Sequence, residues 1–118
     1  MKKLLYLMVV VAFIAALVVT ACGVTDRTTY QVKYEVTGTA QSASLTYQNK
    51  DGGTSQESDV VLPWTYSFEG ESGDFVYISA QNSGETGSVI TTIYRDGDVF
   101  KTSTSTGAYV IASASGSL

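Results

Sequence analysis

Three aspartates beside glycines are the residues of this 118-residue chain whose spacing comes nearest to metal-ligand chemistry. Asp51, Asp96 and Asp98 suggest a calcium loop, because carboxylates are ligands that Ca²⁺ prefers. No segment, however, matches the D-x-[DN]-x-[DN]-G pattern with the following glutamate of such a loop. Asp-Gly is also the expected sequence of a two-residue hairpin turn. The aspartates therefore predict turns, and we expect no bound metal.

A second acidic group, Glu69, Glu71 and Asp74, has the residue types of a glycosidase acid–base pair. Catalytic carboxylates need a cleft and perturbed pKa values, whereas acids on a glycine-containing turn are more simply solvated. The chain also has no histidine and a single cysteine. These counts exclude His-based catalysis, Cys-His nucleophiles, Cys/His zinc sites and an internal disulfide. We therefore predict a protein that is not an enzyme and uses no cofactor.

The single cysteine, Cys22, follows a segment with the features of a secretory signal peptide. Lys2 and Lys3 supply the positive start, and Leu4 to Val19 is an apolar run. Val19-Thr20-Ala21-Cys22 resembles the bacterial lipobox, in which the cysteine becomes the new N-terminus and carries lipid. We predict a cleaved lipoprotein signal peptide over residues 1–21, helical in the membrane or the precursor, and lipidation of Cys22. The alternative is an uncleaved signal anchor, although sixteen residues fall just short of the roughly 17–25 that span a bilayer.

Charge limits the partners of the mature chain. From residue 22 onward, eleven acidic residues stand against five basic ones, a net charge of −6. Nucleic-acid binding needs a basic face, and a polybasic grip on anionic lipid needs one too. We therefore expect no nucleic acid, and contact with the membrane through the lipid on Cys22 alone. This predicts an extracytoplasmic, lipid-anchored protein of the bacterial cell envelope.

Beyond a short polar tether over residues 22–29, the sequence predicts one domain, residues 30–118, built of β-strands. Apolar residues alternate with polar ones from Tyr30 to Thr37, from Ala43 to Tyr47 and from Trp64 to Phe68. Asp96-Gly97 is the strongest hairpin signal. Seven or eight short strands at roughly ten-residue spacing indicate an antiparallel sandwich or barrel. The polar stretch from Thr54 to Asp59 is left open as a strand or a loop.

Aromatic residues at period two, Trp64, Tyr66 and Phe68, have two interpretations. They form either an exposed platform for a sugar or lipid, or part of the core between two sheets. Because a domain of this size without a disulfide needs large apolar side chains, we favour the core.

Six short segments in order resemble the MmpS-type family, small accessory proteins of mycobacterial membranes. They are Tyr34-Glu35-Val36-Thr37-Gly38, Ala43-Ser44-Leu45-Thr46-Tyr47, Leu62-Pro63-Trp64, Ile78-Ser79-Ala80-Gln81, Asp96-Gly97 and Ser105-Thr106-Gly107-Ala108-Tyr109. The resemblance implies an Ig-like β-sandwich outside the cytoplasmic membrane, working with large RND-type (MmpL) transporters that export lipids or siderophores. It also implies a transmembrane anchor, where this chain has a sequence that resembles a lipobox. Many members carry a cysteine pair where this chain has Thr91 and Ala114.

Two function classes remain. One is a lipid-anchored, non-catalytic accessory protein that docks on an RND-type transporter or another envelope complex. The other is a stand-alone envelope lipoprotein with a ligand-binding or structural sandwich. An exposed apolar patch or an unpaired strand edge would favour docking, and a deep aromatic-lined pocket would favour ligand binding. We expect docking contacts at the ends and edges of the sandwich, including Asp96-Gly97 and the region from Thr102 to Tyr109.

Overall fold

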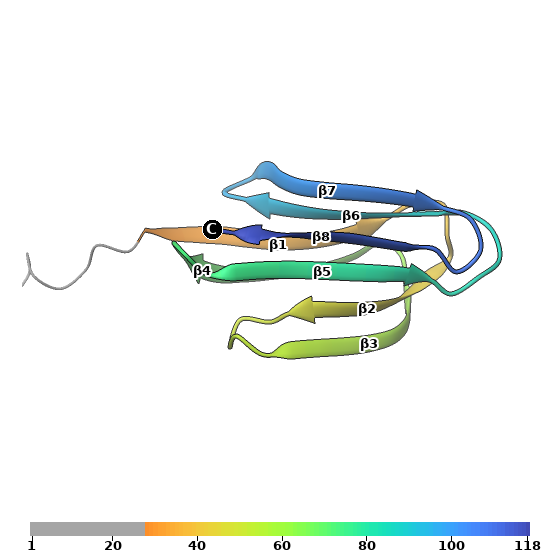
Figure 1. The fold of residues 1–118 in the computed structure, drawn as a ribbon, viewed down its shortest axis with the longest axis horizontal. Coiled ribbons are helices and arrows are strands. Elements are labelled where there is room, and N and C mark those ends of the chain that lie inside the picture. The colour runs from red at the N-terminus through yellow and green to blue at the C-terminus, as the bar shows by residue number, and fades with distance from the viewer. Residues whose placement is uncertain (1–27) are drawn as a thin grey trace, which may run out of the picture.

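Eight antiparallel strands form two sheets in the computed structural model, which describes residues 28–118 (Figure 1). The strands are β1 Thr29–Thr37, β2 Ser42–Gln48, β3 Thr54–Val61, β4 Trp64–Glu71, β5 Phe75–Asn82, β6 Ser88–Arg95, β7 Asp98–Thr106 and β8 Ile111–Ser117. The predicted all-β fold is thereby confirmed, and the segment left open at residue 54 is strand β3. The helix predicted over residues 1–21, and Cys22, lie outside the described residues. None of the described residues belongs to a helix long and apolar enough to cross a membrane.

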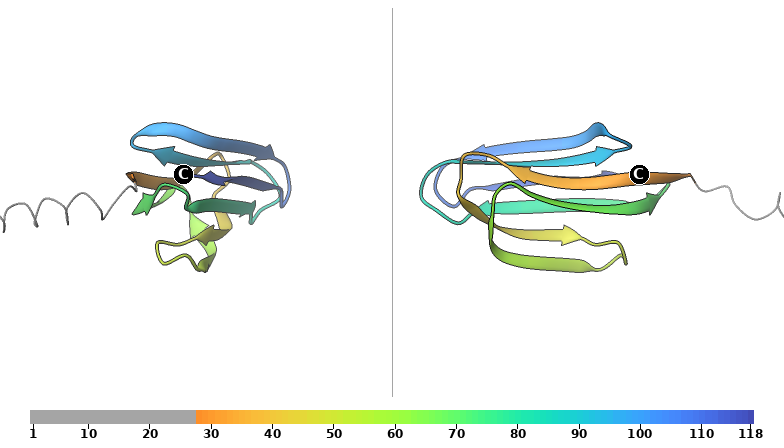
Figure 2. Two further views of the ribbon diagram at one scale, coloured as in Figure 1. Left: turned by 60° about the vertical axis from the view of Figure 1, so that its left-hand side comes forward. Right: turned by 180° about the vertical axis from the view of Figure 1, so that it is seen from behind.

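The strand order of each sheet follows an immunoglobulin-like pattern of pairing. The β1 sheet has the order β4-β1-β6-β7, and the β5 sheet has the order β3-β2-β5-β8. The pairs β1–β4, β2–β5 and β5–β8 correspond to the B–E, C–F and F–G pairs of an immunoglobulin sandwich. The β6–β7 hairpin extends the β1 sheet on its other side (Figure 2). The sheets therefore face each other, and the core lies between them.

The burial of alternate residues explains why these segments form strands. In β1, Val32, Tyr34 and Val36 are buried, whereas Gln31, one position before Val32, is exposed. In β5, Val76, Ile78 and Ala80 are buried in the same way. The edge strands β3 and β7 bury no residue fully, whereas the edge strand β8 buries Ala112 and Ala114.

An aromatic cluster around Tyr34 fills one half of the core. The Tyr34 ring lies 5.3 Å from Phe68, 5.9 Å from Tyr47 and 6.1 Å from Tyr66, measured between ring centroids. Trp64 is half-buried and packs on Tyr47 at 5.1 Å. Aromatic pairs at these distances each contribute about 0.5–1.5 kcal/mol beyond the area that they bury. The residues from Trp64 to Phe68 thus pack against the core, as we favoured, and form no exposed platform.

The hydroxyl of Tyr34 joins the two sheets. It donates to the carbonyl oxygen of Gln48 at 2.7 Å and accepts the backbone N–H of Tyr77 at 3.3 Å. The β2–β5 register ends one pair earlier, at Tyr47 and Ile78. The Tyr34 hydroxyl therefore bonds the Gln48 carbonyl and the Tyr77 N–H, which are the next opposed pair at the end of this ladder. Burial in the core raises the pKa of Tyr34 to about 12.

The two positions at which the resemblance implies a cysteine pair both face the core. Thr91 comes from β6 and Ala114 from β8, and both are buried. The Thr91 hydroxyl has no hydrogen-bond partner among the described residues. An unsatisfied buried hydroxyl costs about 1–3 kcal/mol, so this position is a weak point of the core.

Replacing Tyr34 by phenylalanine tests the bridging role of its hydroxyl. The ring stays, but the Gln48 carbonyl and the Tyr77 N–H both lose a partner. We expect the free energy of unfolding to fall by about 1–3 kcal/mol in urea titrations. Tyr66→Phe is the matched control, because the Tyr66 hydroxyl accepts only the exposed Lys50 N–H at 3.2 Å. Its cost should stay within about 0.5 kcal/mol, and equal losses in both variants would contradict the bridge.

The raised tyrosine pKa values predict loss of stability at alkaline pH. The pKa of Tyr47 is also raised to about 12, first by burial and then by its hydrogen bond to Glu57. The folded state holds both phenol protons more tightly than the unfolded state. The contribution of the two tyrosines to the free energy of unfolding is therefore complete below pH 10. It is lost as the pH rises from 10 toward 12. Urea unfolding midpoints measured from pH 8 to 11.5 should fall above pH 10. In Tyr34→Phe/Tyr47→Phe the fall should be much shallower, and an equally steep fall would refute this origin.

Candidate functional site

The two ends of the sandwich differ in their connection to the preceding chain. The Ser72 N–H donates to the carbonyl oxygen of Thr28 at 2.8 Å, and the Gly73 N–H donates to that of Leu118 at 2.7 Å. The first described residue and residue 118 therefore meet at the β4–β5 turn (Figure 1). We call this the tether end. The β2–β3 and β6–β7 turns lie there too, whereas the other four connections form the opposite, distal end (Figure 2).

Charged residues are concentrated toward the tether end. The three connections of this end, residues 49–53, 72–74 and 96–97, carry four charged side chains, Lys50, Asp51, Asp74 and Asp96. The connections of the distal end, residues 38–41, 62–63, 83–87 and 107–110, carry a single charged side chain, Glu85. The distal connections thus carry fewer charged side chains than those of the tether end, in a domain whose described part has ten acidic and four basic residues. The electrostatic barrier to a protein partner is therefore lowest there.

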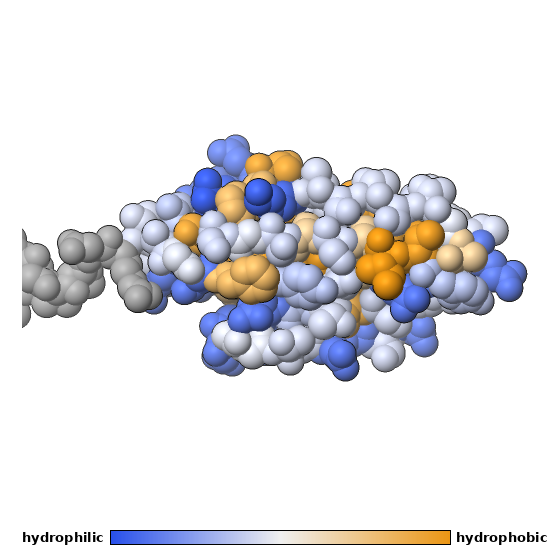
Figure 3. Space-filling model, viewed as in Figure 1, coloured by the Kyte–Doolittle hydropathy of each residue, from blue (hydrophilic) through white to orange (hydrophobic). Residues whose placement is uncertain are grey.

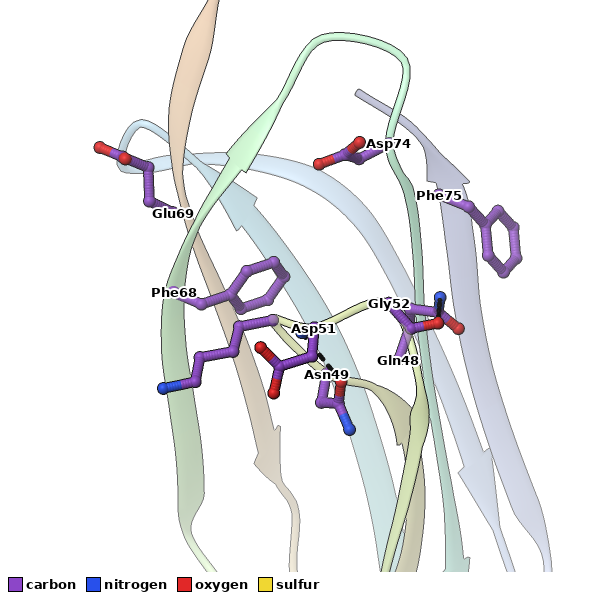
Figure 4. A pocket seen from close by; sticks show the side chains of 9 residues that line it. Gln48, Asn49, Asp51, Gly52, Phe68, Glu69, Asp74 and Phe75 are labelled. Carbon is purple, nitrogen blue, oxygen red and sulfur yellow. Dashed lines mark hydrogen bonds between the residues drawn. The ribbon is translucent and has the colours of Figure 1, made fainter.

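Three of the six acidic residues singled out in the sequence, Asp51, Glu69 and Asp74, line a hollow of about 250 Å³ at the tether end (Figure 4). The Asp74 carboxylate accepts the backbone N–H of Glu71 at 2.9 Å, which fixes the β4–β5 turn. Glu69 accepts the side-chain amide of Gln31 at 3.4 Å. Asp51 also lines the hollow, but no three acidic, His or Cys side chains of residues 28–118 are grouped to hold a metal ion. These acids therefore support turns and exposed hydrogen bonds.

The Asp96-Gly97 turn is fastened to a neighbouring strand. Asp96 and Gly97 have φ values of 52° and 85°, the left-handed conformation that a two-residue hairpin turn needs. The Asp96 carboxylate accepts the Gln31 N–H, and its own N–H donates to the Gln31 carbonyl, both at 2.8 Å. The structure therefore separates the two regions in which we expected partner contacts. Asp96-Gly97 lies at the tether end, and Tyr109 lies at the distal end.

An apolar patch on the β5 sheet lies next to the distal end. Figure 3 looks onto this sheet and shows hydrophobic surface where β8 begins. Tyr109 is 53% exposed and Ile111 is 55% exposed, both high values for large apolar side chains. We call Tyr109 and Ile111 the distal patch. The other exposed ring of this sheet, Phe75, lies at the tether end with 51% exposure.

A buried asparagine that the sequence did not single out supports the distal patch. Asn82 is 1% exposed, and its side-chain NH₂ donates to the carbonyls of Thr86 at 2.9 Å and Gly107 at 3.0 Å. Its side-chain oxygen accepts the Gly84 N–H at 2.8 Å. One side chain thus joins the β5–β6 connection to the β7–β8 connection. No local pattern around Asn82 shows that its partners lie on two separate connections.

The four free strand edges differ in how they are protected. Edge strand β3 carries Glu57 and Asp59 and a register shift against β2, and β4 carries Glu69 and Glu71. Charges and bulges of this kind discourage pairing with other chains. In contrast, residues 102–118, which include the end of β7 and all of β8, contain no charged side chain. The neutral edges therefore lie on the same side of the domain as the distal patch.

Comparison with known proteins identifies the family. The family model described as Mycobacterium membrane protein matches residues 24–115, which is most of the chain. The chain therefore belongs to this family, as the MmpS-type segments of the sequence indicated. No curated protein matches the chain. Membership associates the protein with the mycobacterial type of cell envelope and gives no indication of an enzyme.

Replacing Asn82 by alanine tests whether this side chain orders the distal end. The Gly84 N–H and the carbonyls of Thr86 and Gly107 would lose their partner. We expect the free energy of unfolding to fall by about 2 kcal/mol and amide exchange to accelerate in residues 83–87 and 107–110. Asn49→Ala is the matched control, because Asn49 makes comparable side-chain bonds in the β2–β3 turn. Faster exchange of residues 83–87 and 107–110 in both variants would contradict the assignment. Unchanged exchange of these residues in Asn82→Ala would contradict it too.

Proposed function

We propose that this member of the family is a lipid-anchored accessory subunit of an RND-type membrane transporter. Acylated Cys22 holds the domain to the extracytoplasmic face of the membrane, and the domain docks on the transporter during export of lipid or siderophore-like substrates. The observation that carries the proposal is the polarity of the sandwich. The chain enters at the end with the more charged connections, whereas the neutral distal patch lies away from it, and the edge strand β8 between the two ends carries no charge.

The length of the tether supports a position close to the membrane. Six steps along the chain separate Cys22 from Thr28, and fully extended residues span at most about 3.3–3.6 Å each. The domain would then stay within about 20 Å of its anchor. Two or more acyl chains give stable anchoring. Confinement to the membrane raises the effective concentration near an embedded partner, so a weak protein interface suffices.

Two hollows of the domain have polar linings, which favours docking over ligand binding there. A hollow of about 440 Å³ at the distal end is lined by polar residues, among them Thr39, Gln41 and Asn82. In the hollow at the tether end, Phe68 points toward the β2–β3 turn and Phe75 points away from it (Figure 4). Ligand sites are usually deep and lined mainly by apolar and aromatic side chains. The uncharged edges and the distal patch instead have the character of a protein interface.

In-cell crosslinking of the full-length protein with formaldehyde tests the proposal. We expect wild type to recover an RND-type transporter, identified by mass spectrometry. Cys22→Ala should recover at least tenfold less at equal protein level, because it lacks the lipid that confines the domain. The intact mass of the membrane-extracted wild type should correspond to residues 22–118 plus acyl chains.

Two outcomes would reject this function. One is a mass equal to that of unmodified residues 1–118, which removes the anchor. The other is a lipidated protein that recovers no membrane complex and whose deletion leaves export unchanged. In the second case the stand-alone lipoprotein would replace the transporter subunit.

A further inference from the structure

Tyr109 has a backbone conformation that tyrosine rarely adopts. Its φ is +53°, in the left-handed region. The other two non-glycine residues of this kind among residues 28–118 are Asp59 and Asp96. Aspartate tolerates this region because its short side chain can bond locally, whereas a bulky residue there is strained. A glycine or asparagine would fit the loop with less strain, so the tyrosine needs another explanation.

The backbone of Tyr109 is held firmly in this conformation. Its N–H donates to the Gly84 carbonyl at 3.0 Å, and its carbonyl accepts the Gln81 side-chain amide at 3.1 Å. Asn82 fastens the same two connections to each other. The loop is therefore a rigid support for the residue that it presents.

The side chain of Tyr109 contributes little to this support. Within residues 28–118 its hydroxyl makes no hydrogen bond and its ring no contact with another ring. The side chain is 53% exposed, and Ile111, two residues later, is 55% exposed. Strain that the surrounding structure maintains without an internal role is typical of functional positions. Tyrosine is also among the residues that most often dominate binding at protein interfaces.

Geometry and charge indicate what covers the distal patch. From Ile111 to Leu118, seven strand steps of about 3.3 Å carry the patch roughly 23 Å from the tether end. The four strands of the β5 sheet contain no Lys or Arg, so this face offers no attraction to anionic lipid even if the domain lay flat. Two copies of the domain, each with ten acidic and four basic described residues, repel each other. A neutral recess on another protein needs no Lys or Arg on this face for its binding, and it is not repelled by the negative charge of the domain.

We infer that Tyr109, flanked by Ile111, is the anchor through which the distal end binds an uncharged apolar recess on the extracytoplasmic part of a membrane protein. The inference rests on the proposed function and names the surface that makes the contact. Because the partner must reach the patch, it projects roughly 20 Å or more above the membrane surface. The rigid loop presents the ring already ordered, which lowers the entropy lost on binding.

The test is crosslinking of full-length variants in the cell, with the recovered transporter quantified against wild type. Tyr109→Asn suits the left-handed backbone and removes the ring, and we expect recovery to fall at least tenfold. Tyr109→Phe keeps the ring, and recovery should stay within about threefold of wild type. Phe75→Ala is the matched control, because it removes a ring of similar exposure from the tether end of the same sheet. Its recovery should be unchanged.

Thermal unfolding of the same full-length variants in detergent separates binding from folding. Since asparagine relieves the strain, the midpoint of Tyr109→Asn should equal that of wild type or exceed it by up to about 4 °C. A purely structural tyrosine would instead lower the midpoint. A lower midpoint in Tyr109→Asn would therefore overturn the inference.

The remaining outcomes distinguish this inference from the proposed function. Normal recovery of the transporter by Tyr109→Asn would overturn the anchor and leave the transporter role intact. Failure of wild type to recover any membrane protein would overturn both. Crosslinks of residue 109 to a second copy alone would show that a second copy, and not a recess on another protein, covers the patch. Loss of vesicle binding by Tyr109→Asn in a Cys22→Ala background would show that lipid covers it.

Discussion

The hydroxyl of Tyr34 lies where the two sheets of the sandwich are joined, and the surrounding core is arranged around its ring. It bonds a carbonyl of β2 and an N–H of β5 at the point where their ladder ends. Four aromatic residues from β2 and β4 pack around the ring or on its neighbours. A domain of this size buries only about 60–68% of its unfolded surface, so a polar contact of this kind must be fully satisfied. The same residue thus supplies apolar area and sheet-to-sheet register.

This aromatic arrangement compensates for the absence of a covalent link between the sheets. The resemblance places a cysteine pair at Thr91 and Ala114, which both face the core. A disulfide typically contributes about 2–4 kcal/mol, whereas the Thr91 hydroxyl is buried without a partner. The half of the sandwich near β6 and β8 is therefore its weaker half. The bridging Tyr34 belongs to the other half, where β1, β2 and β4 meet.

Most of the fold was predictable from the sequence because it depends on local patterns. Alternation marked β1, β2 and β4, and Asp96-Gly97 marked the β6–β7 hairpin. Strand β3 was ambiguous because it is an edge with no fully buried residue, so its sequence lacks the pattern that burial imposes. The distal features depend on contacts between segments far apart in the chain. Nothing local in Asn82 shows that its amide bonds Gly107, and no propensity places Tyr109 at positive φ.

The polarity of the domain gives the two ends different roles in any membrane-bound arrangement. Antiparallel pairing of the free β7 edges of two copies would place their tether ends at opposite ends of the pair, because every strand runs along the axis between the two ends. A nine-residue strand spans about 30 Å, more than the roughly 20 Å that six residues from Cys22 to Thr28 can reach. If Cys22 carries the proposed anchor, two copies in one membrane therefore cannot pair in this way with their strands perpendicular to the membrane. A strand from a different protein has no such restriction, and the uncharged end of β7, residues 102–106, stays available to it.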